Sequence, residues 1–333
     1  MAPAAARSAS TGATARPSRT IAARRPFRRV VVVVSTPLAL VAAAALLGAG
    51  SAGGAFPGTN GKIAFVSDRT GGKDIYLIDP DGTHLRRLTR TPTALEEAPA
   101  FSSDGRRIAF QTNRDGNWEI YVVDVDGTHL RRLTRNAGDD THPSFSPSGA
   151  RIVFSSRRAG NTDVYTMDAA DGSHVKRVTT DPGDDVEPTF APGGRRIAFV
   201  GTRPHHVLFA IDPSGTHEQQ LTPDYGEDQD PDFGPSGRSI VFWRWHDGLL
   251  GSATVVIDSD GSNARGLAGH PEFDRAPVYS PNGRRIAVSR FDVDRESFEI
   301  VTVNRDGTHP RQLTKDPGED GQPSWGPAVE AGD

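Results

Sequence analysis

The chain has 333 residues, and its 38 Lys and Arg against 42 Asp and Glu give a formal net charge of −4. The absence of cysteine excludes disulfides, thiolate zinc sites, a cysteine nucleophile and a lipid-modified N-terminal cysteine. With 36 Gly and 25 Pro, the composition favours a turn-rich protein over one built from long helices.

The charge is divided unevenly along the chain. The first 52 residues hold no acid and seven arginines: Arg7, Arg16, Arg19, Arg24, Arg25, Arg28 and Arg29. The remainder therefore has 31 bases against 42 acids, a net charge of −11. Since phosphate contacts need a basic face, this acidic body argues against nucleic-acid binding.

Residues 1–55 are predicted to form an export signal. Three zones support this: a basic region at 1–29, a mostly apolar stretch at 30–47 and small residues suited to cleavage at 48–55. The signal places the body outside the cytoplasm, and periplasm, cell wall and extracellular space all stay open.

The export route has two interpretations. The pair Arg24-Arg25 resembles a twin-arginine signal, which a receptor reads and which is then removed. The alternative is an uncleaved N-terminal anchor, because eighteen residues reach the low end of the spanning range, although Ser-Thr-Pro at 35–37 interrupts them. After cleavage no membrane span is expected.

The body is predicted to contain six copies of one unit. A proline stands two residues before an aromatic residue at spacings of 43 to 46, in Pro99/Phe101, Pro143/Phe145, Pro188/Phe190, Pro231/Phe233, Pro277/Tyr279 and Pro323/Trp325. An acidic-Gly turn keeps the same period at Asp81-Gly82, Asp126-Gly127, Asp171-Gly172, Asp260-Gly261 and Asp306-Gly307. A period of this length is typical of repeat folds.

Each copy is predicted to fold as four short strands, A to D. In the second copy these are 99–102, 107–110, 119–124 and 130–134, and Asp-Gly hairpin turns separate several of them. Four strands in 40–50 residues are typical of a β-propeller blade.

The two ends of the repeat region complement each other. The first copy begins with strand B at 61–65, and the segment 322–327 is a strand A that lacks its B, C and D. We therefore predict an all-β, six-bladed β-propeller over 58–327 whose four-stranded antiparallel blades form a ring closed by the C-terminal strand. Such closure removes the open sheet edge. Residues 328–333 are expected to be a disordered tail.

The repeat resembles the TolB-type WD40-like (PD40) family. The resemblance rests on Pro-x-Phe-Ser-Pro-x-Gly, Ile-Ala-Phe, Ile-Tyr-x-x-Asp-x-Asp-Gly and Arg-x-Leu-Thr, which recur through the body. It implies a six-bladed propeller outside the cytoplasm that works through protein contacts. The α/β domain that precedes the propeller in TolB itself has no counterpart between the signal and the first blade.

One predicted face carries the A–B and C–D turns and a set of histidines. These follow the turn glycine by two residues: His84, His129, His174, His217 and His309. Because they stand on separate blades, a structural role is favoured over a metal site. The Asp-x-Asp-Gly turns also lack the third ligand and the terminal Glu of an EF-hand. No metal ligands are assigned.

The other face, made of B–C and D–A loops, carries an acid three residues before each strand A proline. The set is Glu96, Asp140, Asp185, Asp228, Asp274 and Asp320. Arginines stand four residues after the strand B aromatic in the first four blades: Arg69, Arg114, Arg158 and Arg203. We interpret Arg69, Arg114 and Arg158 with these acids as structural Arg–carboxylate pairs between B–C and D–A loops. The alternative is an acidic funnel for a basic peptide, calcium or another cation.

Blades 4 to 6 depart from this pattern, and departures on a rigid scaffold favour binding. The distance from strand B to strand C changes from 11 residues to 10 in blade 4 and 13 in blades 5 and 6. The candidate ligand-binding residues are Arg203, His205, His206, Trp243, Arg244, Trp245, His246 and Asp292. The alternative is that one tryptophan belongs to the core and the other covers a longer loop.

Two functions remain open, besides a role as a scaffold that calcium or another cation stabilises. The first is a monomeric binding module for a protein, peptide or envelope glycan on the B–C/D–A face. The second is a carbohydrate-active lyase or hydrolase that uses His and Asp groups of blades 4 to 6. The sequence has no Gly-x-Ser-x-Gly or His-Glu-x-x-His motif, so no catalytic residue is assigned.

Overall fold

The computed structural model describes residues 56–245, 252–267 and 274–329, all of whose regular elements are strands. The predicted export signal lies outside the described residues. Among those residues there is no helix with the length and apolar character needed to cross a membrane.

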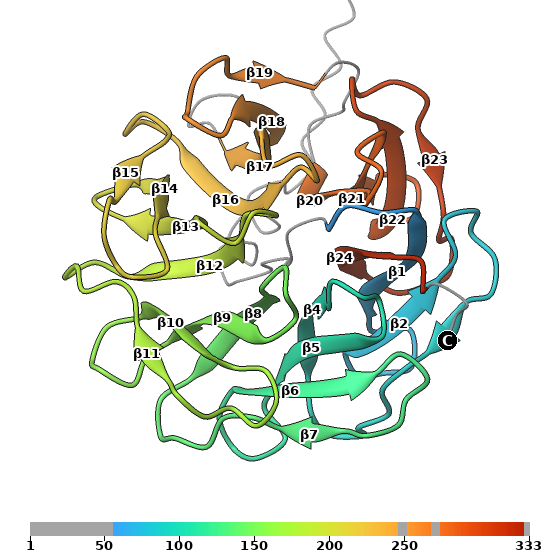
Figure 1. The fold of residues 1–333 in the computed structure, drawn as a ribbon. Helices are drawn as coiled ribbons and strands as arrows, with labels where there is room; N and C mark the ends of the chain where they lie inside the picture. The colour runs from blue at the N-terminus through green and yellow to red at the C-terminus, as the bar shows by residue number, and fades with distance from the viewer. Residues whose placement is uncertain (1–55, 246–251, 268–273, 330–333) are drawn as a thin grey trace, which may run out of the picture. The chain divides into compact units, whose positions relative to one another are not determined.

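The strands form six four-stranded antiparallel sheets. In each sheet strand A is innermost and strand D outermost (Figure 1). Blade 1 joins β24 (Asp320–Pro327), β1 (Asn60–Ser67), β2 (Asp74–Ile78) and β3 (Arg86–Arg87). Blade 2 contains β4 (Glu96–Phe101), β5 (Arg107–Thr112), β6 (Glu119–Asp124) and β7 (Arg131–Arg132). Blade 3 contains β8 (Asp140–Phe145), β9 (Arg151–Ser156), β10 (Asp163–Asp168) and β11 (Lys176–Arg177).

The remaining blades have the same strand order. Blade 4 contains β12 (Asp185–Phe190), β13 (Ile197–Thr202), β14 (His206–Ile211) and β15 (Gln219–Gln220). Blade 5 contains β16 (Glu227–Phe233), β17 (Ser239–Trp245), β18 (Ser252–Asp258) and β19 (Arg265–Gly266). Blade 6 contains β20 (Asp274–Tyr279), β21 (Arg285–Asp292), β22 (Ser297–Asn304) and β23 (Arg311–Gln312).

The ring is closed as predicted. Strand β24 pairs antiparallel with β1, with Trp325 opposite Ile63, so the last strand completes the first blade. The strands A contact one another in the order β24, β4, β8, β12, β16 and β20, and β20 contacts β24 again. The prediction of a six-bladed, all-β propeller is thereby confirmed. Beyond β24, the Ala328 amide donates to the Thr59 carbonyl at 2.9 Å. Residues 330–333 of the predicted tail lie outside the described part.

The C–D turns show why the repeat keeps its glycine. In blade 1 the Gly82 amide donates to the carbonyl oxygen of Asp79 at 2.8 Å. In blade 3 Gly172 has a φ of 77°, and a Cβ there would lie 2.1 Å from the Leu133 carbonyl oxygen of blade 2. Only glycine combines the positive φ with this close approach between blades.

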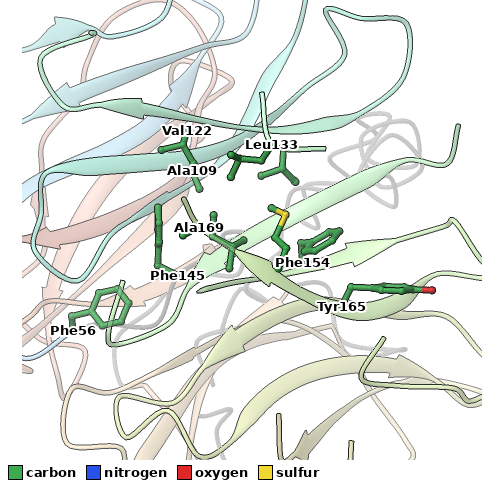
Figure 2. Close-up of a cluster of buried hydrophobic side chains, with 11 residues drawn as sticks. Phe56, Ala109, Val122, Leu133, Phe145, Phe154, Tyr165 and Ala169 are labelled. Atoms are coloured by element: carbon green, nitrogen blue, oxygen red, sulfur yellow. The ribbon is translucent and has the colours of Figure 1, made fainter. Parts of the chain in front are cut away.

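The hydrophobic core lies between blades rather than within them. Each of the six large clusters contains side chains of two adjacent blades. In Figure 2, Val122 and Leu133 of blade 2 pack with Phe145, Phe154 and Tyr165 of blade 3. Full burial of an aromatic or aliphatic side chain stabilises by about 1.5–3 kcal/mol. A blade therefore depends on its neighbours for stability.

Candidate functional site

The predicted acids form a closed ring of ion pairs, one in each blade. All six carboxylates are at most 1% exposed. The N–O distances include 2.7 Å for Arg69–Asp320, 3.0 Å for Arg158–Asp140 and 2.7 Å for Arg203–Asp185. Each pair lies within one blade, because the acid stands at or next to the first residue of strand A and the arginine follows or belongs to strand B.

In blades 1 to 4 the arginine comes from the B–C loop and stacks on the strand C aromatic residue. The guanidinium carbon lies 4.8 Å from the ring centre of Tyr76 for Arg69 and 4.4 Å from that of Phe209 for Arg203. In blade 1 the Arg69 Nε also donates to the Ser67 hydroxyl at 2.8 Å. A small residue two positions after the strand B aromatic leaves room for this geometry.

In blades 5 and 6 the arginine comes from strand B itself. Arg244 Nη2 donates to Asp228 at 2.7 Å, and Arg290 Nε donates to Asp274 at 2.8 Å. Here the strand C position holds Val255 or Val301, so a loop arginine has no aromatic ring on which to stack. Arg290 was not anticipated from the sequence, and Arg244 was placed among the ligand candidates. The sequence feature that could have identified these two arginines is their position two residues after the apolar residue of strand B.

At two acids of the ring, burial has the largest effect on the carboxylate. It raises the pKa of Asp185 to about 6, although the Arg203 guanidinium acts in the opposite direction. Burial likewise raises the pKa of Asp320, against hydrogen bonds from Ser67 and Arg69. These directions follow from the low polarity around carboxylates that water does not reach.

A second inner ring was not anticipated from the sequence. Each strand A has a bulge at the residue before its proline, with φ between 48° and 55°, and the six residues are Ala98, His142, Glu187, Asp230, Ala276 and Gln322. Side chains of this ring reach the next blade: Glu187 Oε2 accepts from the Asp230 amide at 2.7 Å. The sequence feature that could have identified this ring is the position of its residues, each directly before the strand A proline.

The acidic part of the inner ring lies in blades 4 and 5. The Trp243 indole N–H donates to Asp230 Oδ2 at 2.6 Å, and Trp243 is only 7% exposed. Burial raises the pKa of Glu187 to about 7. Burial lowers the pKa of His142 in blade 3 to about 4. The candidate Trp243 thus belongs to a buried polar contact.

Three of the ligand candidates meet at the edge between blades 4 and 5. His206 Nδ1 lies 3.1 Å from Glu227 Oε2, and His205 Nδ1 lies 3.4 Å from Glu227 Oε1. Trp245 is the strand partner of Glu227, and the nearby Tyr225 is 65% exposed. We call these five residues the blade 4–5 patch. Glu227 and Tyr225 were missed in the sequence, because no repeat marker distinguishes them.

The other candidates lie elsewhere. Arg203 and Arg244 belong to the ion-pair ring, and Asp292 at the end of β21 pairs with Arg295 at 2.6 Å. That hairpin accommodates the two extra residues of blade 6 by longer strands, in which Asp292 faces Ser297. His246 lies outside the described residues.

The turn histidines stay apart, each bound within its own turn. His84 Nδ1 lies 2.7 Å from Asp79 Oδ2, while 77% of the His84 side chain is exposed. A hydrogen bond from Lys62 is the main cause of the lowered pKa of Asp79, and His84 adds to it. In the described residues no three His, Asp or Glu side chains are grouped so as to hold a metal ion.

The model of the family described as TolB beta propeller domain (PD40) matches residues 93–273, more than half of the chain. A segment of 45 residues is 49% identical to the Tol-Pal system protein TolB of Geobacter sulfurreducens, which covers 14% of this chain and 10% of that protein.

Two solved structures illustrate the range of similar folds. TolB from Acinetobacter baumannii has a TM-score of 0.70 at 23% identity, over 82% of this chain and 68% of that one. Oligogalacturonate lyase from Vibrio parahaemolyticus has a TM-score of 0.56 at 11% identity, over 80% of this chain and 78% of that one. At these identities the likeness concerns the fold alone.

Proposed function

Since the chain belongs to the PD40 family of TolB β-propeller domains, we propose that it is an exported binding module. Its ligand would be a protein, a peptide or a cell-envelope component, held on the face of the B–C and D–A loops. The observation that supports this is the blade 4–5 patch, where two histidines lie beside the Glu227 carboxylate, with the exposed Tyr225 and the half-buried Trp245 at the same edge. Tyr and Trp are favoured anchors of interfaces, and loops on a rigid scaffold are usual binding positions.

Export would depend on residues 1–55, with cleavage near Ala52 or Ala55. N-terminal sequencing of the protein recovered outside the cytoplasm tests this. A first residue between 50 and 58 is the expected result. A chain that still begins near residue 1 and stays with the membrane would support the anchored alternative instead.

Binding is tested by pull-down from envelope extracts with the exported protein and a Tyr225→Ala/Trp245→Ala variant. The variant should lose a partner that the wild-type protein retains, because it removes both aromatic anchors of the patch. A matched control is His129→Ala/Leu130→Ala, which removes an exposed imidazole and an exposed apolar side chain from the other face. Equal capture by all three proteins would show that the patch is not the binding surface.

A second function is supported by the His206–Glu227 contact of 3.1 Å, because an imidazole beside a carboxylate can act in general acid–base chemistry. The substrate would be an envelope polysaccharide, and the reaction a lyase or hydrolase cleavage. Incubation with such polysaccharides, followed by assay of new unsaturated or reducing ends, separates enzyme from binder. Activity that a Glu227→Gln variant lacks would favour the enzyme.

A further inference from the structure

A cavity of about 540 Å³ that is wide open to solvent lies at the junction of blades 5 and 6, on the face of the A–B and C–D turns. Its lining includes Arg265 of β19, Arg284 of the turn between β20 and β21, and Arg305 of the turn after β22. This face is opposite to the blade 4–5 patch, so a ligand bound in the cavity would be independent of the proposed function.

The three guanidinium groups have no partner within the described part of the chain. None of them forms an ion pair or donates a side-chain hydrogen bond there. The acid that lines the cavity, Asp306, is already engaged, since its Oδ1 accepts from the Thr308 amide at 3.0 Å and from the Thr308 hydroxyl at 2.7 Å. These hydrogen bonds are the main cause of the lowered pKa of Asp306.

The junction also lacks a contact that the other five junctions have. There the first residue of strand D donates to a backbone carbonyl of the next C–D turn: Arg86 to Val125, Arg131 to Ala170, Lys176 to Ser214, Gln219 to Asp260 and Arg311 to Asp81. We call these contacts the strand D clasps. Arg265 occupies the same position in blade 5 and makes no such bond to the described residues of blade 6.

The sequence of blade 6 changes the charge at this place. Arg305 stands where the other blades have uncharged residues: Pro80, Val125, Ala169, Pro213 and Ser259. Asn304 stands where the other blades have Asp79, Asp124, Asp168, Asp212 and Asp258. One turn thus gains a positive charge and loses a negative one. Because like charges repel, Arg305 disfavours a clasp by Arg265 at this turn.

Positive charges from blades 5 and 6 affect the same side chain, that of Tyr279. Burial raises the pKa of Tyr279, the last residue of β20, and the charges of Arg305 and Arg265 are among the groups that oppose this rise. The two charges thus act on one buried hydroxyl, although they come from different blades.

From this geometry we propose that the junction of blades 5 and 6 is an oxyanion site that takes a phosphate group. A guanidinium presents a planar fork of donors that matches phosphate oxygens, and three such groups around one cavity supply more donors than a single oxyanion needs. The ligand would restore the link between blades 5 and 6 that the other junctions obtain from their strand D clasps.

Calorimetric titration with inorganic phosphate at constant ionic strength tests the site, with chloride as the background anion. The wild-type protein should bind phosphate saturably. Arg305→Ser, which introduces the residue that blade 5 has at this position, should weaken binding about tenfold or more, since a hydrogen bond to a charged group is lost. Arg195→Ser is the matched control: it removes the blade 4 counterpart of Arg284 from the same face and should bind phosphate as the wild type does.

Cosedimentation with vesicles distinguishes a lipid source from a free phosphate. Binding to phosphatidylglycerol vesicles but not to phosphatidylcholine vesicles, lost in Arg305→Ser, assigns the phosphate to a lipid headgroup. Saturable binding of inorganic phosphate with the same dependence on Arg305 assigns it to a soluble ligand. The proposal is overturned if the wild type binds neither probe, if Arg305→Ser binds as the wild type does, or if Arg195→Ser loses as much.

Discussion

Blades 1 to 3 and blades 4 to 6 have the same strand order but different sets of ion pairs. In the first group an arginine of strand D also pairs with an acid of strand C, at 2.7 Å for Arg87–Asp74, 2.9 Å for Arg132–Glu119 and 2.7 Å for Arg177–Asp163. In the second group the strand D position holds Gln220, Gly266 and Gln312. These blades therefore have one fewer charged link between their outer strands.

The inner ion pair, by contrast, is present in every blade, although the arginine comes from one of two different positions. A loop arginine stacked on a tyrosine or phenylalanine supplies it in blades 1 to 4. A strand B arginine supplies it in blades 5 and 6, where valine replaces the strand C aromatic residue. The buried acid is common to all six blades, whereas the position of the arginine is not. We conclude that the buried acid requires an arginine partner, which either the loop or strand B can supply. Once strand B supplies the charge, the pair no longer requires an arginine from the loop.

The largest expected effect comes from removing that arginine. Arg244→Ala leaves the fully buried Asp228 without its partner and should lower the free energy of unfolding by about 3–5 kcal/mol. Arg114→Ala in blade 2 should cost a similar amount, because Glu96 is equally buried. Urea denaturation measures both.

Arg90→Ala is the control, since this exposed arginine should change the free energy of unfolding by no more than about 0.5 kcal/mol. If Arg114→Ala costs several kcal/mol and Arg244→Ala costs no more than the control, the two arginine positions are not equivalent. The strand B arginine would then not replace the loop arginine in stabilising the blade.

Glu187 distinguishes blade 4 by its response to pH. Its pKa of about 7 lies above the ordinary 4.5, so the folded protein keeps a proton that the unfolded chain releases between these values. The contribution of this group to stability is therefore present below pH 4.5 and is lost as the pH rises to 7. Glu187→Gln should match the wild type at pH 4.5 and be more stable at pH 8, on the order of 2–3 kcal/mol.

Urea denaturation of both proteins at the two pH values checks this prediction. His142 acts in the opposite direction, because its lowered pKa of about 4 costs stability as the pH falls below 6.5. That contribution is common to both proteins and cancels in the comparison. An equal difference between them at pH 4.5 and pH 8 would contradict the raised pKa of Glu187.

Substitutions of Trp243 in blade 5 and Trp325 in blade 1 allow the two groups of blades to be compared with the same type of side chain. Trp243→Phe in blade 5 removes a 2.6 Å hydrogen bond to the carboxylate of Asp230 and should cost about 1–2 kcal/mol. Trp325→Phe in blade 1 removes a 3.2 Å hydrogen bond to a neutral backbone carbonyl and should cost less. Thermal or urea unfolding measures both, and the reverse order would mean that Asp230 gains nothing from the indole.

The fold could be predicted from the sequence because repetition tests each marker six times. A proline before an aromatic residue and an Asp-Gly turn mean little once, but at a constant period they define strands and turns together. The ring closure followed from Trp325, which carried the strand A pattern after the last complete blade. The unpaired strand B at the start of the first blade required the same conclusion.

The candidate site was less predictable, because side chains that meet across blades have no shared pattern in the chain. His205, His206 and Trp245 were recognised as departures from the repeat, but Glu227, to which two of them bind, is an ordinary acid in an acidic sequence. Burial was only partly predictable: the sequence allowed that one of the tryptophans belongs to the core, and the structure shows that this one is Trp243 rather than Trp245.

The smallest expected effect concerns the strand D clasps, and it tests whether blade 5 differs from the others. Arg311→Ala removes the 2.6 Å hydrogen bond to the Asp81 carbonyl and should cost about 0.5–1 kcal/mol, as is usual for an exposed contact. Arg265→Ala removes a charge that has no clasp to the described residues and lines the same cavity as Arg305, so it should leave stability unchanged or raise it slightly. Urea unfolding at low ionic strength measures both, because salt would screen the repulsion. If Arg265→Ala destabilises as much as Arg311→Ala, blade 5 clasps blade 6 in solution, and the two groups of blades are joined alike.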